Sequence, residues 1–483
     1  MKRCNRAVRR WGPTILIGLA IAAGPLWLWR APMRAYFLKF DDFVYLARSR
    51  TPDRLRENLF RPHQGHVVPL FRIETFTLAQ IAGTLEKTPA VLGAASYATL
   101  LIAMTLIGLV VARETGRAAM GLVAMSAVGL SSVPGPTLLW YASGQAMAAG
   151  AMILAMLAAL QAWRIGGSRR ALAMALVAET AAPLLWSGGF VAGPVGAAYL
   201  GADGRPRSRA VALILLGSTG VMVVLARFAG AGMPGVGISA IGAAVAHGSQ
   251  ALGEAIVLNN LGLDARTTST QAIALIGAIV ALWGWSRRGS PIRPLEAAGS
   301  MMAVGTIGMI FAVRGVDEDF SELRPFGWYH AMADLGAVLF ACGWYAGPIE
   351  SPASAVATPT RREWLAVSGL ALAMLTIQSP RADRVVFEYA EMAAPMARPV
   401  AGSVARSNAS DLIDQTRAQR AALAELDHLE ARARRGSYDR EAVRRAASAV
   451  PAMPNHLPEF DPAELPAIPD DRRSPPSPGA DRR

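Results

Sequence analysis

Long apolar runs separated by short polar connections dominate the chain. The first run extends from Trp11 to Trp29, and a polar stretch at 30–88 follows it. Runs near 20 residues match the hydrocarbon thickness of a bilayer when they are helical. The later runs cover 89–112, 118–133, 137–163, 171–187, 188–201, 209–228, 269–286, 294–313, 327–347 and 364–378. This pattern predicts an all-α polytopic membrane protein with about eleven transmembrane helices.

The first apolar run follows a basic segment, residues 1–10, and this arrangement is also typical of a signal peptide. The run is about 19 residues long and ends at Arg30 without a small-residue cleavage site. We therefore interpret it as a retained spanning helix. The segment 238–258 is a further candidate for a re-entrant or interfacial helix.

The basic residues of the short connections fall mostly on one side of the predicted bundle. Arg169–Arg170 and Arg287–Arg288 lie on the side of the N-terminus, whereas the opposite turn at 134–136 has no Lys or Arg. Positive charge marks the cytoplasmic side of a membrane protein. We therefore expect an N-in, C-out topology, with the first loop 30–88 and the tail outside.

Three regions follow from these patterns. Residues 1–378 form the transmembrane domain, and residues 379–450 form an extracytoplasmic helical tail with a predicted helix at 411–435. Residues 451–483 are rich in proline and are expected to be disordered.

Composition excludes several classes of protein. Hydrophobic residues make up 53% of the chain and charged residues 17%, which does not suit a soluble enzyme. The net charge of +13 suggests nucleic acid at first. The basic residues, however, lie mostly in the short connections on one side of the bundle, where they orient the helices in the membrane. No nucleic-acid partner is therefore expected. No phosphate-binding glycine-rich motif is present, and ATP is not an expected partner.

Two adjacent carboxylates lie near the start of the first outer loop. Asp41 and Asp42 follow the first predicted span by about a dozen residues, in the partly apolar segment 40–46. A carboxylate at the depth of the lipid headgroups is a candidate general base. The alternative is that the pair caps a short amphipathic helix.

The same loop contains two histidines, His63 and His66, flanked by prolines and by Gly65. Imidazoles presented by an ordered loop suit metal binding, phosphate contact or proton transfer. A surface loop without such a role is the alternative, and the spacing without a third ligand is weak evidence for a metal. Arg61 is a secondary candidate beside them.

Residues 69–83 have the spacing of an amphipathic helix that lies at the membrane surface. Glu74 falls on or near its polar face. We expect a solvated carboxylate or a partner of Arg72 there rather than a catalytic group, so Glu74 is a secondary candidate.

A late outer turn combines an acidic cluster, an arginine, a tyrosine and a histidine. Arg324 and Tyr329 stand at the mouth of the predicted span 327–347, with His330 just inside it. An arginine at this depth suits a lipid-linked phosphate, and an aromatic belt with a snorkelling arginine is the alternative. Asp317 and Asp319 are secondary candidates.

Two polar residues, Gln145 and Glu179, fall within or near apolar runs. A polar side chain is costly at such positions unless it faces the interior of the bundle. These two residues are weaker candidates for a functional site.

Together these features resemble the GT-C superfamily of integral membrane glycosyltransferases. The resemblance rests on the N-in first span, the long outer loop with Asp41-Asp42-Phe43, the many short spans, and the late element from Arg324 to Tyr329. It covers residues 11–378. The chain differs from larger members in having a tail of only about 100 residues in place of a folded C-terminal domain.

The resemblance implies sugar transfer on the extracytoplasmic face, from a polyprenyl-phosphate donor to a lipid, glycan or protein acceptor. It implies Asp41 or Asp42 as the base, with His63, His66 and Arg324 beside the departing phosphate. Some members use a divalent metal, Mg or Mn, but no ligand set is identifiable here and the metal stays open. The expected location is a bacterial inner membrane.

Two other functions share this predicted topology. One is a transporter or flippase for a lipid-linked solute, which needs polar sites at the middle of the membrane and related halves. The other is a non-catalytic membrane protein that organises an envelope assembly. Neither a repeat nor paired broken helices are visible in the sequence.

Overall fold

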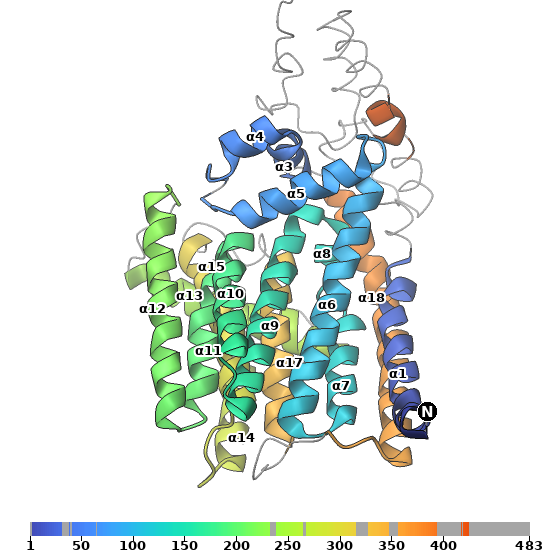
Figure 1. The fold of residues 1–483 in the computed structure, drawn as a ribbon, viewed down its shortest axis with the longest axis vertical. Coiled ribbons are helices and arrows are strands. Elements are labelled where there is room, and N and C mark those ends of the chain that lie inside the picture. Colours follow the sequence, from blue (N-terminus) through green and yellow to red (C-terminus); the bar gives the residue numbers. More distant parts are fainter. Residues whose placement is uncertain are drawn as a thin grey trace, which may run out of the picture.

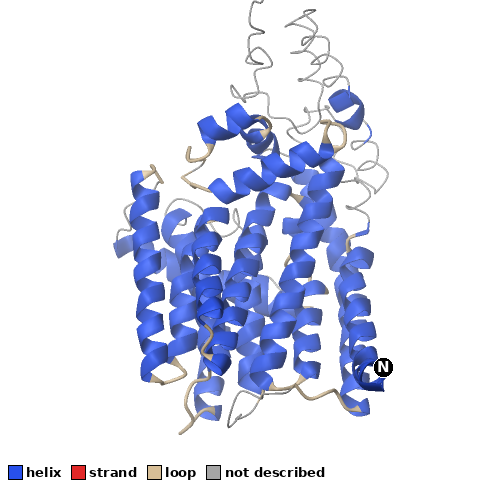
Figure 2. Ribbon diagram, in the orientation of Figure 1, coloured by secondary structure: helices blue, strands red, loops and turns tan. Residues whose placement is uncertain are grey.

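The chain folds as a bundle of helices. The computed structural model describes residues 2–30, 38, 41–63, 65–231, 238–263, 267–314, 327–346, 356–393, 417 and 419–424. Within these residues it contains helices and turns, two isolated β-bridges and no β-strand (Figure 2). The predicted all-α class is confirmed for this part of the chain.

The helices that cross the bundle are connected mostly by short turns. The N-terminal half contains α1 (Lys2–Leu28), α3 (Asp41–Ser49), α4 (Pro52–Asn58), α5 (Pro69–Ala82), α6 (Thr88–Thr115), α7 (Ala118–Gly129), α8 (Gly135–Leu139), η1 (Tyr141–Ser143), α9 (Gly144–Gly166) and α10 (Arg169–Leu185). The remainder contains η2 (Ser187–Val191), α11 (Ala192–Gly201), α12 (Pro206–Phe228), α13 (Ile238–Gln250), η3 (Ala251–Leu258), α14 (Ser269–Ser286), α15 (Pro294–Arg314), η4 (Gly327–His330), α17 (Ala331–Tyr345) and α18 (Arg361–Ala393).

Six stretches of helix in the described residues are long and apolar enough to cross a membrane. They lie in α1, α6, η1–α9, α12, α14 and α15. The other predicted spans form α7, α10, α11, α17 and the first half of α18, which are shorter or less apolar. The structure thus agrees with a helical membrane protein, and the number eleven stays a prediction. The segment 238–258 is helical, as α13 and η3.

The predicted region boundary at 378 lies inside α18, which continues to Ala393. Of the predicted tail helix at 411–435, residues 417 and 419–424 are described, and they are helical. Gln419 in this segment is buried and exchanges two hydrogen bonds with the backbone of Leu38, at 2.7 and 2.9 Å. Residues 451–483 lie outside the described residues.

The two ends of the bundle differ in character. Helices α3, α4 and α5 form a layer across one end (Figure 1), and we call this the loop end. The arginine-rich connections α6–α7, α9–α10, α11–α12 and α14–α15 lie at the other end. We call it the arginine-rich end. The layer contains the helices predicted for the first loop, and their place at the membrane surface stays a prediction.

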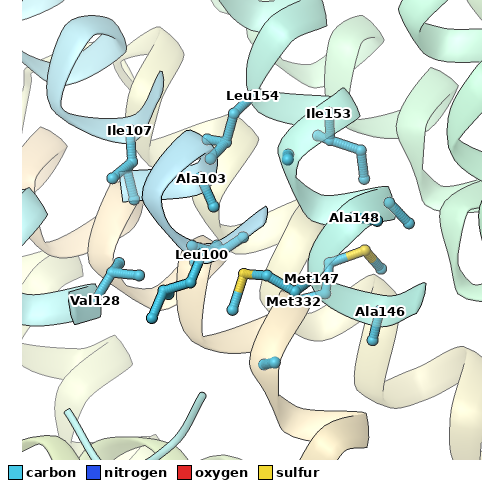
Figure 3. Packing of buried hydrophobic residues seen from close by; sticks show 14 of the residues in the cluster. Leu100, Ala103, Ile107, Val128, Ala146, Met147, Ala148, Ile153, Leu154 and Met332 are labelled. Carbon is cyan, nitrogen blue, oxygen red and sulfur yellow. The ribbon is translucent and has the colours of Figure 1, made fainter. Parts of the chain in front are cut away.

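The core of the bundle is built from side chains of α6, α7, α9 and α17. Leu100, Ile107, Val128, Leu154 and Met332 meet there (Figure 3), and each is fully buried. Figure 3 also shows alanines on α6 and α9 between these larger side chains. Without a hydrophobic drive between helices in lipid, small residues allow the close van der Waals packing that holds spans together.

Helices α15 and α17 touch through their backbones at two glycines. A Cβ at Gly299 would lie 2.3 Å from Phe340 N, and one at Gly336 would lie 2.5 Å from Ala303 N. These distances are too short for any side chain, so the pair requires glycine for steric reasons.

Gly299→Ala should therefore lower stability although alanine is the better helix former. We expect a loss of about 1–3 kcal/mol, typical of overpacking, because the methyl group must push α17 away. Gly277→Ala on α14 is the matched control, since nothing lies within 4 Å of its Cβ position. Thermal unfolding in detergent measures both. Equal unfolding temperatures for the two variants would contradict the contact.

Candidate functional site

Helix α3 presents one polar face towards the inside of the loop layer. Asp41, Tyr45 and Arg48 follow each other at intervals of four and three residues, which places them on one side of a helix. Tyr45 and Arg48 are buried, and the Asp41 side chain is 23% exposed. The face therefore points into the molecule and reaches solvent at Asp41.

The two histidines sit opposite each other in a short hairpin. His63 N donates to His66 O at 2.9 Å, and His66 N donates to His63 O at 2.8 Å. Gly65 adopts a φ of +80° between them, a conformation that glycine accepts without strain. Side chains directly opposite in an antiparallel pair point to the same face. Both imidazoles thus project to one side.

Asp41 and His63 are close enough to interact. His63 Nε2 lies 3.2 Å from Asp41 Oδ1, and Arg48 Nη1 lies 3.4 Å from His63 Nδ1. Because a guanidinium only donates, Arg48 favours the tautomer in which Nδ1 accepts and Nε2 carries the proton. The protonated Nε2 is then the ring nitrogen nearest the carboxylate, but it forms no hydrogen bond with the described residues in this conformation, so Asp41 and His63 form a charge-paired contact that a small reorientation would turn into an acid–base pair.

Tyr45 packs against the His63 side of this pair. Its ring packs edge-on against His63, with centroids 5.1 Å apart, and the Arg72 guanidinium lies 5.5 Å from its centroid. Burial raises the pKa of the Tyr45 hydroxyl, and the negative charge of Asp41 raises it further, while a hydrogen bond with Gln145 acts in the other direction. The phenol therefore stays protonated over the physiological pH range.

Asp42 has a different environment from its neighbour. Its side chain is fully buried, and its Oδ1 accepts the Ala142 N–H at 2.8 Å. Ala142 lies in η1, where the chain bends between α8 and α9. Asp42 thus connects the loop layer to the bundle, and it does not line the pocket described below.

His66 is held in place by residues at the junction between α10 and η2. Ser187 Oγ lies 2.6 Å from His66 Nδ1. The neighbouring Trp186 stacks on Tyr329 of η4, with centroids 6.5 Å apart and planes 26° apart. A Cβ at Gly188 would lie 2.1 Å from the Trp186 ring, so this residue must be small for the indole to take its place.

These side chains surround one pocket at the loop end. Its volume is about 40 Å³, and its lining comes from α3, the histidine hairpin, η1, the start of α9, and the residues around η2 and η4. The pocket is lined by Asp41, Tyr45, His63, His66, Trp140, Ala142, Ser143, Gln145, Trp186 and Tyr329. Sites for small-molecule ligands commonly have about 300–1,000 Å³, so a sugar needs a wider opening than this conformation has.

The pocket brings together four of the predicted site residues, namely Asp41, His63, His66 and Tyr329. His330 is buried beside Tyr329 and does not line it. Arg61 is exposed, and its carbonyl accepts a hydrogen bond from Arg72 Nη2 at 3.0 Å. The predicted residues that lie outside the described part of the chain are Asp317, Asp319 and Arg324.

Metal ligation has little support in the described part of the chain. No three His, Cys, Asp or Glu side chains come together there in a way that could hold an ion. Asp41 and His63 are a pair, and a metal site of the usual kind needs more protein ligands or waters. Mg or Mn therefore has no ligand set among these residues.

Sequence patterns missed several members of the site. Arg48 had a usable signal, since it follows Asp41 by seven residues on the same helix face. Ser187 and Trp186 had none, because Ser187 reaches His66 and Trp186 reaches the pocket only through the packing of α10 against α5 and the bend after α10. Gln145 was among the weaker candidates and lines the pocket, whereas Glu179 accepts hydrogen bonds from Ser218 and Thr219 of α12.

Comparisons with known proteins give no parallel for this geometry. No protein-family model, no curated protein and no solved structure matches the chain.

Glu74 on α5 is partly buried, in contrast to the solvated carboxylate expected from its helix face. Burial raises its pKa from 4.5 to about 7, and a hydrogen bond with Tyr141 opposes this shift. Tyr141 also lies 3.1 Å from Thr75 through its hydroxyl oxygen. Glu74 thus forms part of the contact between the loop layer and η1.

This contact should make stability depend on pH. The pKa of the Glu74 carboxyl group is higher in the folded state than in the unfolded state. Its contribution to the stability of the folded state is therefore complete below the unfolded pKa, near 4.5, and is lost as the pH rises through the folded pKa of about 7. Glu74→Gln should therefore gain on the order of 2 kcal/mol relative to wild type at pH 8 and little at pH 4.5.

Unfolding temperatures measured between pH 4.5 and pH 8 test this expectation. Glu57→Gln, on the exposed side of α4, is the control and should follow the wild-type curve. A Glu74→Gln curve parallel to that of wild type would exclude a buried, titrating Glu74.

Proposed function

We propose that the protein is a membrane glycosyltransferase that moves a sugar from a polyprenyl-phosphate donor to a lipid, glycan or protein acceptor. In this proposal the chain has a GT-C-like architecture with about eleven spans, N-in and C-out. It resides in the inner membrane of a bacterium, and the pocket at the loop end faces the extracytoplasmic side.

The convergence of distant residues on one pocket is the observation that carries the proposal. Asp41, the two histidines and Tyr329 come from three separate segments of the chain, and all four line the same pocket. A pocket that gathers a carboxylate, two imidazoles and a phenol offers the groups that acid–base chemistry needs. The arginine-rich connections at the opposite end support an outward orientation of the pocket.

The pocket supplies the groups that sugar transfer requires. Asp41 accepts the proton of the acceptor hydroxyl, and the acceptor oxygen forms a bond to the anomeric carbon of the sugar. The bond between that carbon and the phosphate oxygen breaks, and its electron pair leaves with the lipid phosphate. His63 orients Asp41, and His66, held by Ser187, stabilises the charge that develops on the phosphate.

A second, apolar pocket adjoins the first and supports a lipid-linked donor. The two share His66, Trp186 and Tyr329, and the second continues to Met309 and Ile310 on α15. A donor phosphate beside His66 would thus have an apolar path for the first part of its isoprenoid chain. Binding must widen both pockets, because they have volumes of only about 40 and 30 Å³.

Asp41→Asn tests the role of the base. The amide cannot accept the proton, so sugar transfer should fall roughly 10²–10⁴-fold. Cells that lack the native chain and carry each variant are supplied with labelled sugar, and incorporation into lipid, glycan and protein fractions is measured. Asp53→Asn, in the exposed first turn of α4, is the matched control and should retain full transfer.

Membrane insertion and yield must be the same for both variants. Full transfer by Asp41→Asn would contradict the proposal. Movement of a lipid-linked solute by the purified protein in liposomes, without any covalent change, would favour a transporter instead.

A further inference from the structure

A larger cavity lies at the arginine-rich end, far from the pocket described above. It has a volume of about 530 Å³ and is lined by residues at the ends of α6, α9, α14 and α17 and at the start of α15. This size lies within the usual range for ligand sites. Helix α6 alone spans 28 residues between the two ends, a length of roughly 40 Å. The cavity is thus a separate site.

Two arginines, Arg287 and Arg293, line this cavity. Arg293 Nη1 donates to Gly343 O at 2.9 Å, and Arg287 Nη2 donates to Trp344 O at 3.0 Å. These carbonyls belong to the last turn of α17, where free carbonyls and the helix dipole attract cations. A residue that serves only for orientation in the membrane needs no such contacts, as the exposed neighbour Arg288 illustrates.

The positive charge of Arg293 is not balanced by a described carboxylate. Arg287 pairs with Glu296, and Arg164 pairs with Asp203 at 2.7 Å and with Glu114. No ion pair involving Arg293 occurs among the described residues. Burial lowers the pKa of the Arg293 guanidinium, and the charge of Arg287 lowers it further. An anion in the cavity would relieve both effects.

The mouth of the cavity has the composition of a membrane interface. Ile292 in its wall is 48% exposed, and Trp285 and Tyr345 on the flanking helix ends are 62% and 75% exposed. Exposed aromatic side chains at helix ends lie at the level of the lipid headgroups. Trp344 faces the cavity and donates to Ser286 Oγ at 2.8 Å. A ligand that enters from the membrane would bring its headgroup to the arginines.

We propose that this cavity binds a phosphate group, held by Arg293 and Arg287, and that the phosphate belongs to the headgroup of a membrane lipid. Arginine suits this ligand because its planar guanidinium can form two parallel hydrogen bonds to phosphate oxygens. Free phosphate offers the same chemistry without the apolar part. The proposal does not depend on sugar transfer at the loop end.

Binding to the full-length protein in detergent tests the proposal. Three probes are used: dioctanoyl phosphatidic acid, dioctanoylglycerol and inorganic phosphate. Dioctanoylglycerol differs from phosphatidic acid only in lacking the phosphate. We expect saturable binding of phosphatidic acid by native mass spectrometry. Arg293→Gln should weaken this binding roughly tenfold or more, because a charged hydrogen bond is lost. Arg288→Gln is the matched control and should bind as wild type does.

A second measurement uses the wild-type chain, so that it does not depend on folding of a variant. Phenylglyoxal modifies accessible arginines, and phosphatidic acid should protect Arg293 while Arg288 stays reactive. Protection by phosphatidic acid alone assigns the phosphate to a lipid, and equal protection by inorganic phosphate assigns it to a free anion. Equal binding of dioctanoylglycerol and phosphatidic acid would overturn the proposal. So would phosphatidic acid that binds Arg293→Gln as it binds wild type and does not protect Arg293.

Discussion

The hydrogen bond from Ala142 N–H to the buried carboxylate of Asp42 is the constraint on which the loop end depends. A buried carboxylate is costly unless it is well paired, so the bond fixes where α3 can lie on the bundle. Asp41 is the preceding residue on the helix and therefore points in another direction, into the pocket beside His63. One carboxylate positions the layer, and its neighbour is the base of the proposed sugar transfer.

This arrangement gives the molecule two sites with opposite properties. The pocket at the loop end combines a carboxylate with imidazoles in a narrow space, which suits proton transfer. The cavity at the arginine-rich end is wide and cationic, which suits binding of an anion without chemistry. The bundle between them is closed by small residues such as Gly299 and Gly336. The two sites lie at opposite ends of the bundle.

Local structure was predictable where local rules decide it. Thr51 caps α4 as its position before Pro52 indicates, and α5 ends at Ala82 before Gly83, whose φ is +71°. The separate roles of Asp41 and Asp42 were not predictable, because sequence does not fix which face of α3 meets the bundle. Contacts such as His66 with Ser187 join residues 121 positions apart and follow only from tertiary packing.

A double-mutant cycle at Asp41 and His63 tests the central claim that these residues act together in sugar transfer. Transfer of labelled sugar is measured in membrane vesicles with Asp41→Asn, His63→Gln and the double variant. If His63 acts through Asp41, the double variant loses no more activity than Asp41→Asn alone. Losses that multiply, or transfer at the wild-type rate in both single variants, would contradict the account.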